Sequence, residues 1–182
     1  GHEGGGNASL RKHWRASGKR VLVPMCGKTV DMLWLEEQGN SVVGVELSDI
    51  AARAFFQENG LRFTVHEGRL AAYSAEDRDI TIYCGDLFEF DETGFTGWYD
   101  RGAFVATPAE QRPAYAQHID ARLAPEACRL LITLEYDDEI ATGPPFSISR
   151  DEVRRYWPEL QEIERYEDIE NGPPKFREAG LQ

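Results

Sequence analysis

The sequence predicts an α/β fold in which helices cover both faces of a mostly parallel sheet, as in a three-layer α/β/α sandwich. Short apolar runs of strand length alternate along most of the chain with segments of helical periodicity. The apolar runs show no regular polar alternation, which is typical of strands buried on both faces of a parallel sheet. The length of 182 residues and the hydrophobic content of 41% fit a single domain that spans residues 1–182.

The amino-terminal half shows this alternation with clear boundaries. Asn7 and Ser48 stand where helix N-caps are expected, and Gly39 and Gly60 stand where helices end. Residues 61–79 are polar and mixed, and they predict an irregular crossover. The elements expected in this half are helix 8–17, strand 20–25, helix 29–38, strand 41–45 and helix 48–59.

The same alternation continues in the carboxyl-terminal half. Its most apolar strand covers residues 129–136. In parallel sheets of this kind, ligands bind at the carboxyl ends of the strands, near the switch point beside the first strand. The functional residues are therefore expected at those ends. The other elements expected here are strand 80–84, a strand ending at 98–101, helix 108–123, helix 151–156 and a candidate sixth strand at 160–166.

Composition and charge exclude several classes of protein. The net charge of −12 argues against nucleic acid as a partner, because phosphate binding needs clustered Lys and Arg. The longest apolar runs fall far short of the ~20 residues that span a bilayer, and no signal-peptide pattern is present. The three cysteines lack CxxC spacing, which argues against a disulfide framework and a structural zinc site. We therefore expect a cytoplasmic monomer without a membrane partner or a metal.

The ends of the first two strands carry the first candidate site residues. The turn after the first strand contains Gly27, which permits a tight turn and close approach of the backbone to a ligand. This turn is neither a GxGxxG motif nor a Walker A loop, so nucleoside triphosphate binding is not predicted. Glu46 ends the second strand and suits a hydrogen bond to both hydroxyls of a ribose. The alternative is a solvated carboxylate at a helix N-terminus.

The next two strand ends carry further candidates. Asp86, beside Gly85, stands where a nucleoside-binding fold places groups against adenine, and Phe88 suits either the core or the adenine wall. Asp100 and Arg101 are adjacent on an extended strand, so their side chains are expected to point to opposite sides. One would face the core of the site and the other its mouth. A lone arginine is more often a solvated surface residue.

Taken together, these segments resemble the thiopurine S-methyltransferase family. The resemblance runs from about residue 2 to residue 180, and several motifs in the same order make it specific. It implies a Rossmann-like fold with a seven-stranded, mostly parallel sheet that binds S-adenosylmethionine. The motifs that carry it are VLVPMCGKTVDMLW at 21–34, GNSVVGVE at 39–46, YCGDLF at 83–88, YDRG at 99–102 and GPPF at 143–146.

The resemblance also assigns residues to the cofactor. Met25 stands where the family has a leucine that contacts the cofactor through its backbone, and Gly27 follows in the same turn. Glu46 would hold the ribose. Asp86 and Leu87 would border the adenine. These five residues are the predicted cofactor contacts on the first three strand ends.

On the substrate side, the resemblance assigns Arg101 to the methionine end of the cofactor and to the substrate mouth. Lys175 falls near a family arginine that faces the substrate, and Arg177 is close enough that this role stays open between the two. The family's amino-terminal helix, which covers the cofactor, has no counterpart before the opening Gly1-His2-Glu3, so it is absent or not included. Its last strand is expected to be missing past Gln182.

The activity that the resemblance implies is transfer of a methyl group from S-adenosylmethionine to the sulfur of a small aromatic or heterocyclic thiol, or to a related selenium or tellurium species, with S-adenosylhomocysteine as the product. A cation such as Arg101 beside the sulfur would favour the thiolate. Two alternatives stay open: a methyltransferase for halide or another small anion, and a non-catalytic nucleoside-binding protein on the same fold. The first turn favours the thiol reading.

Overall fold

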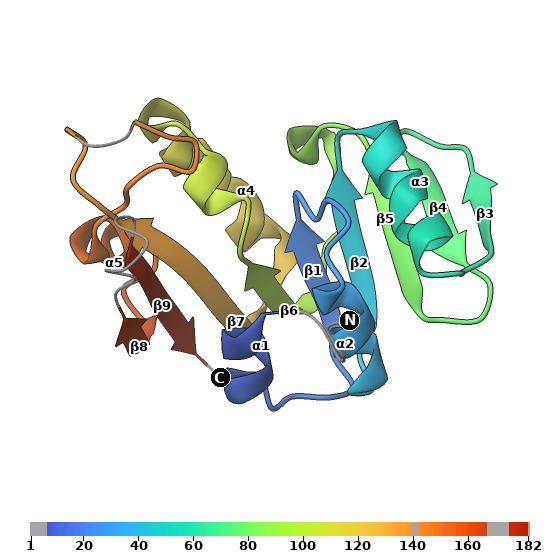
Figure 1. Ribbon diagram of the computed structural model, residues 1–182, viewed down its shortest axis with the longest axis horizontal. Coiled ribbons are helices and arrows are strands. Elements are labelled where there is room, and N and C mark those ends of the chain that lie inside the picture. Colours follow the sequence, from blue (N-terminus) through green and yellow to red (C-terminus); the bar gives the residue numbers. More distant parts are fainter. Residues whose placement is uncertain (1–6, 140–141, 167–174, 182) are drawn as a thin grey trace.

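The computed structural model describes residues 7–139, 142–166 and 175–181, with only the backbone described for 166 and 175–181. It confirms the α/β fold class. One sheet orders its strands as β3-β4-β5-β2-β1-β6-β7-β9-β8. Helices lie on both faces of this sheet, which gives the three layers that the sequence predicts (Figure 1).

Five parallel strands form the middle of the sheet, and the sequence predicts all five. Each pairs in parallel with its neighbour, in the order β5-β2-β1-β6-β7. Their last residues therefore meet at one edge of the sheet, here called the carboxyl edge. These strands are β1 (Arg20–Pro24), β2 (Ser41–Glu46), β5 (Ile80–Cys84), β6 (Phe95–Asp100) and β7 (Leu123–Glu135).

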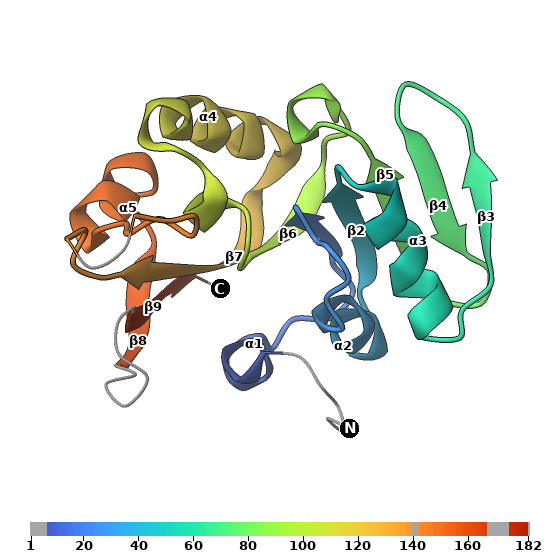
Figure 2. The same ribbon diagram turned by 45° about the horizontal axis from the view of Figure 1, so that its top comes forward.

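The helices divide between the two faces of the sheet (Figure 2). Asn7 and Ser48 cap the first and third helices as predicted, because each side chain accepts hydrogen bonds from backbone N–H groups of the first turn. The first helix ends at His13 rather than at residue 17, because the chain becomes extended at Trp14. One face carries α1 (Ala8–His13), α2 (Asp31–Glu37) and α3 (Asp49–Glu58), and the other carries α4 (Arg112–Arg122) and α5 (Arg150–Tyr156).

The segment 61–79 is not irregular, and this prediction is wrong. It forms an antiparallel hairpin of β3 (Phe63–His66) and β4 (Ala71–Ala75), which extends the sheet beyond β5. Of the residues in these two strands, only Tyr73 is buried. A strand at the rim of a sheet with so little buried surface carries no apolar run, so the usual sequence signal is missing.

The expectation of a missing last strand is also wrong. Strand β9 (Lys175–Leu181) lies between β7 and β8 (Gln161–Tyr166) and runs antiparallel to both. With it, the sheet has the seven strands expected from the family resemblance, to which the β3–β4 hairpin is added. The sequence of β9 contains no β-branched residue, so strand propensity does not reveal it. The candidate sixth strand is confirmed as β8.

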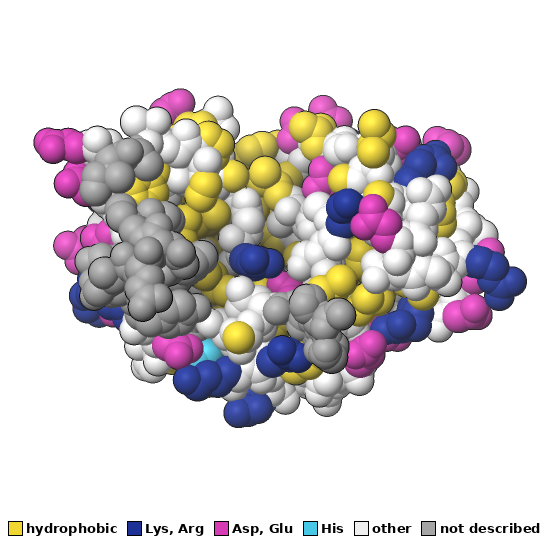
Figure 3. Space-filling view, viewed as in Figure 1, with side chains coloured by type: hydrophobic (Ala, Val, Ile, Leu, Met, Phe, Trp, Pro, Cys, Tyr) yellow, Lys and Arg dark blue, Asp and Glu magenta, His cyan; other side chains and the backbone are white. Residues whose placement is uncertain are grey.

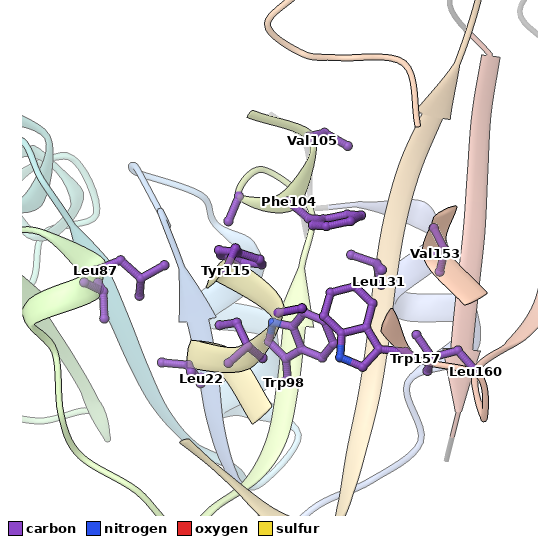
Figure 4. Packing of buried hydrophobic residues seen from close by; sticks show 14 of the residues in the cluster. Leu22, Leu87, Trp98, Phe104, Val105, Tyr115, Leu131, Val153, Trp157 and Leu160 are labelled. Atoms are coloured by element: carbon purple, nitrogen blue, oxygen red, sulfur yellow. The ribbon is translucent and has the colours of Figure 1, made fainter. Parts of the chain in front are cut away.

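Two apolar clusters, one on each face, hold the layers together. Figure 4 shows the cluster beneath α4 and α5, where the Trp98 and Trp157 ring centroids are 5.0 Å apart and Phe104 meets Trp157 edge-on at 5.1 Å. On the other face, Phe55 and Phe56 pack edge-on at 5.1 Å under α3. Each large side chain buried in this way stabilises the fold by roughly 1.5–3 kcal/mol. The sheet is thereby fixed on both faces, and so is the geometry of its carboxyl edge.

Candidate functional site

The turn between β1 and α2 presents its backbone outward at the carboxyl edge. Met25 has a φ of 50°, which is uncommon for a residue other than glycine, and its side chain is 46% exposed. Gly27 also has a positive φ, and a Cβ added there would meet nothing within 4 Å. The turn therefore leaves open space beside its backbone, as a ligand that approaches it closely requires.

Glu46 joins this turn to the end of β2. Its Oε1 accepts a hydrogen bond from the Gly27 backbone N–H at 2.8 Å, and its Oε2 accepts one from the Ser48 N–H at 2.9 Å. A carboxylate offers about four lone-pair sites, so each oxygen keeps one acceptor position for a ligand. The structure thus brings together the predicted residues Gly27 and Glu46, and it fixes the carboxylate between two strand ends.

Close packing beneath the turn depends on Gly44. A Cβ at this position would lie 2.6 Å from the Cys26 sulfur and 3.0 Å from the Met32 sulfur. Cys26 is buried, and burial together with the charge of Glu46 raises the pKa of its thiol. This cysteine is therefore a packed apolar group rather than a nucleophile.

The end of β5 supplies the next predicted residues. Asp86 is exposed and caps a short 3-10 helix, because its Oδ1 accepts the Phe88 N–H at 2.9 Å. Leu87 is only 8% exposed and packs into the apolar cluster under α4, so only its backbone is available at the edge. The Phe88 side chain is 44% exposed, and its ring lies 5.3 Å from that of His118. Phe88, rather than Leu87, presents an apolar side chain here.

Exposed apolar side chains gather around these strand ends and form what we call the apolar rim. Figure 3 shows hydrophobic side chains along the upper middle of the molecule, toward which β1 and β2 point in Figure 1. Burial and the neighbouring Arg122 lower the pKa of His118, so this ring is uncharged at neutral pH. An exposed apolar patch on a protein surface is typical of a site that binds a ligand or a partner. The apolar rim consists of Met25, Leu47, Ile50 and Phe88.

Asp100, at the end of β6, points inward as the alternation predicts. It is 0% exposed and accepts hydrogen bonds from the Ala103 and Phe104 N–H groups, both at 3.1 Å, and from the Tyr115 hydroxyl. Burial raises its pKa to about 6, although these donors act in the opposite direction. Asp100 therefore organises the loop that follows β6 and does not reach the edge.

Arg101 points the other way and is half exposed. Its Nη1 lies 3.8 Å from Oδ2 of Asp31, a carboxylate that is 0% exposed. Asp31 also accepts the Asn7 N–H at 2.6 Å and the Tyr99 hydroxyl at 2.7 Å. Sequence reasoning missed Asp31. The signal available was a carboxylate on the buried stripe of α2, one position before the buried Met32.

Lys175 lies at the carboxyl edge by its backbone, because it pairs with the last residue of β7, but its side chain is outside the described residues. The GPPF motif lies near the ends of β6 and β7. The Phe146 N–H donates to the Val105 carbonyl at 2.6 Å, and the Tyr136 hydroxyl donates to the Pro145 carbonyl at 2.8 Å. These hydrogen bonds tie the GPPF segment to the chain segments that follow β6 and β7.

A cavity of about 310 Å³ lies beside the β3–β4 hairpin, lined among others by Arg69, Leu70, Tyr83 and Glu92. It contains none of the predicted site residues, so we place the candidate site at the carboxyl edge instead. The part of the chain that the structure describes contains no group of three or more His, Cys, Asp or Glu side chains that could hold a metal ion. None of the described helices has the length and apolar character needed to cross a membrane.

Comparison with known sequences gives consistent matches over nearly the whole chain. The family model described as thiopurine S-methyltransferase matches residues 2–182. A thiopurine S-methyltransferase of Bordetella petrii is 47% identical over 182 residues, covering 94% of this chain and 82% of the relative. One from Pseudomonas entomophila is 43% identical over 186 residues, covering 96% and 84%.

Solved structures share the fold at low sequence identity. The magnesium protoporphyrin IX methyltransferase of Synechocystis PCC 6803, with bound S-adenosylmethionine, aligns with a TM-score of 0.66 at 14% identity, covering 96% of this chain and 76% of that one. TehB from Haemophilus influenzae aligns with a TM-score of 0.64 at 17% identity, covering 96% and 60%. At such identities, these likenesses establish the fold alone.

Proposed function

The chain belongs to the thiopurine S-methyltransferase family, and from this membership we propose that it transfers the methyl group of S-adenosylmethionine to the sulfur of a small aromatic or heterocyclic thiol. The observation that carries the proposal is the Glu46 carboxylate, which accepts hydrogen bonds from the Gly27 N–H in the turn after β1 and from the Ser48 N–H just after β2. It is a fixed, partly open acceptor where the fold binds its ligand.

The residues of the carboxyl edge fit the cofactor in charge and shape. Glu46 has free acceptor positions for the two ribose hydroxyls, and charge-assisted hydrogen bonds of this kind contribute about 1.5–3 kcal/mol. The open space beside Gly27 leaves room for the methionine end against the backbone of the first turn. Asp86 and the backbone of Leu87 would border the adenine, with Phe88 covering one face of its ring.

When bound, S-adenosylmethionine supplies an electrophilic methyl group, so the chain has to align the acceptor and stabilise its anionic form. Arg101 is the charged group suited to this, because a nearby cation lowers the pKa of a thiol and raises the fraction of thiolate. The apolar rim lies beside Glu46 and Asp86, where it would shield the adenosine part of the cofactor from water. Lys175 is assigned to the acceptor side on the family resemblance and on the place of its backbone at the edge.

Two other activities are compatible with the same edge. Arg101 could equally bind a halide or another small anion, and a nucleoside-binding protein without activity would need only the Glu46 side of the site. Family membership favours the thiol. The GPPF segment is compatible with it, because hydrogen bonds tie this segment to the chain after β6 and β7, and its two prolines are exposed and could contact a flat aromatic acceptor.

The test is to incubate the protein with S-adenosylmethionine and, separately, thiophenol, 6-mercaptopurine, phenol and iodide, and to identify products by mass spectrometry. We expect S-methyl products from the two thiols and none from phenol, whose oxygen is a poorer nucleophile toward a methyl group. Methyl iodide without thioether would support the small-anion alternative. Binding of S-adenosylhomocysteine without any methylated product would support the non-catalytic one. Either result would overturn the proposal.

A further inference from the structure

A buried carboxylate lies just beneath the predicted substrate mouth, outside the residues that the proposed function uses. Asp31 is 0% exposed, and each of its oxygens has a hydrogen-bond donor, the Asn7 N–H at 2.6 Å and the Tyr99 hydroxyl at 2.7 Å. These two bonds would suffice to keep a carboxylate in the core. A purely structural role for Asp31 would require no further partner.

The geometry around Arg101 indicates that Asp31 also acts on this arginine. The Asp31 oxygen that accepts the Tyr99 hydroxyl also lies 3.8 Å from Nη1 of Arg101. Within the described residues, no other carboxylate lies at ion-pair distance from Arg101. Because the Asp31 side chain is fully buried and the Arg101 side chain is half exposed, the anion is held rigidly while the cation is free to move. A fixed charge beneath a mobile one restricts where the mobile one lies.

We propose that Asp31 is the positioning residue for Arg101, holding its guanidinium at the substrate mouth without touching substrate or cofactor. The proposal deepens the proposed function and rests on it, because Arg101 is the group assigned to the sulfur acceptor. Asn7 connects Asp31 to the first helix as well. It caps α1 and also donates to Asp31, so the same carboxylate ties the entry of α1 to the guanidinium.

A double-mutant cycle tests this. Wild type, Asp31→Asn, Arg101→Ala and the double variant are compared by the kcat/KM for thiophenol and, independently of activity, by the Kd of S-adenosylhomocysteine in calorimetry. We expect Asp31→Asn to lower kcat/KM at least about fivefold and to weaken product binding about threefold when Arg101 is present. In the Arg101→Ala background, both effects should shrink to less than about twofold.

Asp49→Asn is the matched control, since Asp49 also begins a helix and also accepts from a tyrosine hydroxyl and an arginine. Its effect should be the same in both Arg101 backgrounds. Equal effects of Asp31→Asn in both backgrounds would overturn the proposal and leave Asp31 a structural residue. If Asp31→Asn does not fold, Asp31→Glu, which keeps the charge but displaces it, enters the same cycle with the same criterion.

If wild type methylates no thiol, the proposed function fails. The cycle on the Kd of S-adenosylhomocysteine then still decides the role of Asp31, because this measurement needs no acceptor. Coupling between Asp31 and Arg101 in product binding would uphold the positioning role, and additive effects would overturn it.

Discussion

The carboxylates that end β2 and β6, Glu46 and Asp100, have opposite surroundings, and these surroundings suit them to different roles. Glu46 is partly exposed and accepts two backbone N–H groups, so it keeps acceptor positions for a ligand. Asp100 is fully buried, and its donors come from the loop after β6 and from Tyr115. The first is therefore suited to binding, and the second is suited to holding the loop that carries Arg101.

The raised pKa of Asp100 makes stability depend on pH. Its pKa is about 6 in the folded protein, against 3.8 as the ordinary value. The folded protein thus binds this proton more tightly than the unfolded chain does. The stabilisation is complete below about pH 4 and is lost as the pH rises through about 6, a difference of about 3 kcal/mol.

Asp100→Asn, which does not titrate, isolates this contribution. We expect the free energy of unfolding of the variant, relative to wild type, to rise by about 2 kcal/mol between about pH 4 and pH 7. Urea denaturation of both proteins across this range measures the difference, and other titrating groups cancel in it. A difference that does not vary with pH would mean that Asp100 does not titrate in this range.

At the residue scale, strand ends were the most informative part of the sequence. The structure brings Glu46 to Gly27 and separates Asp100 from Arg101, as position and alternation predict. It does not bring the Leu87 side chain to the edge, because the 3-10 helix after Asp86 turns it into the core. Asp31 stands on the buried stripe of α2, but its partners Asn7 and Tyr99 are distant in the sequence, so its role could not be assigned from that stripe alone.

At the element scale, the turn after β1 and strand β2 form one packed unit. Gly44 allows Cys26 and Met32 to lie directly against the strand, and the Cys26 N–H donates to the Val45 carbonyl at 3.0 Å. This packing fixes the position of the Gly27 backbone at the carboxyl edge. The geometry of the first turn therefore depends on a glycine that is buried beneath it.

Gly44→Ala should disturb this unit. The added Cβ would lie 2.6 Å from the Cys26 sulfur, so we expect the free energy of unfolding to fall by about 1–3 kcal/mol. Cys26→Ala removes the clashing sulfur, so the double variant should recover at least half of the loss. Urea denaturation measures both.

Gly68→Ala is the matched control. Its Cβ would meet only the Leu70 carbonyl oxygen at 3.5 Å, an ordinary contact, and the change should stay within about 0.5 kcal/mol. If Gly44→Ala is as well tolerated as this control, or if Cys26→Ala gives no recovery, the packing account of the turn is wrong.

The elements that the sequence predicts well are those buried on both faces. Strands β1, β2, β5 and β7 are rich in buried apolar residues, so composition alone reveals them. The β3–β4 hairpin and β9 are not predicted, because they lie outside the central strands of the sheet. A strand there is specified by pairing with a neighbour rather than by burial on both faces, so it carries no continuous apolar run.

At the scale of the whole molecule, the site follows from the order of the strands. Parallel strands bring the first turn, Glu46, Asp86 and Arg101 to one edge, although they are spread over residues 25–101. Arg101 is half exposed there and has the buried Asp31 carboxylate beneath it. Family membership and local geometry therefore support the same edge, where we propose that the cofactor binds.

Calorimetric titration of S-adenosylhomocysteine into wild type and Glu46→Gln tests the central claim, with Glu92→Gln as the control because Glu92 is a partly exposed glutamate away from this edge. We expect micromolar affinity for wild type and the control (about −8 kcal/mol), and at least about tenfold weaker binding for Glu46→Gln. Equal affinities of the three proteins would contradict the claim that this carboxylate holds the cofactor.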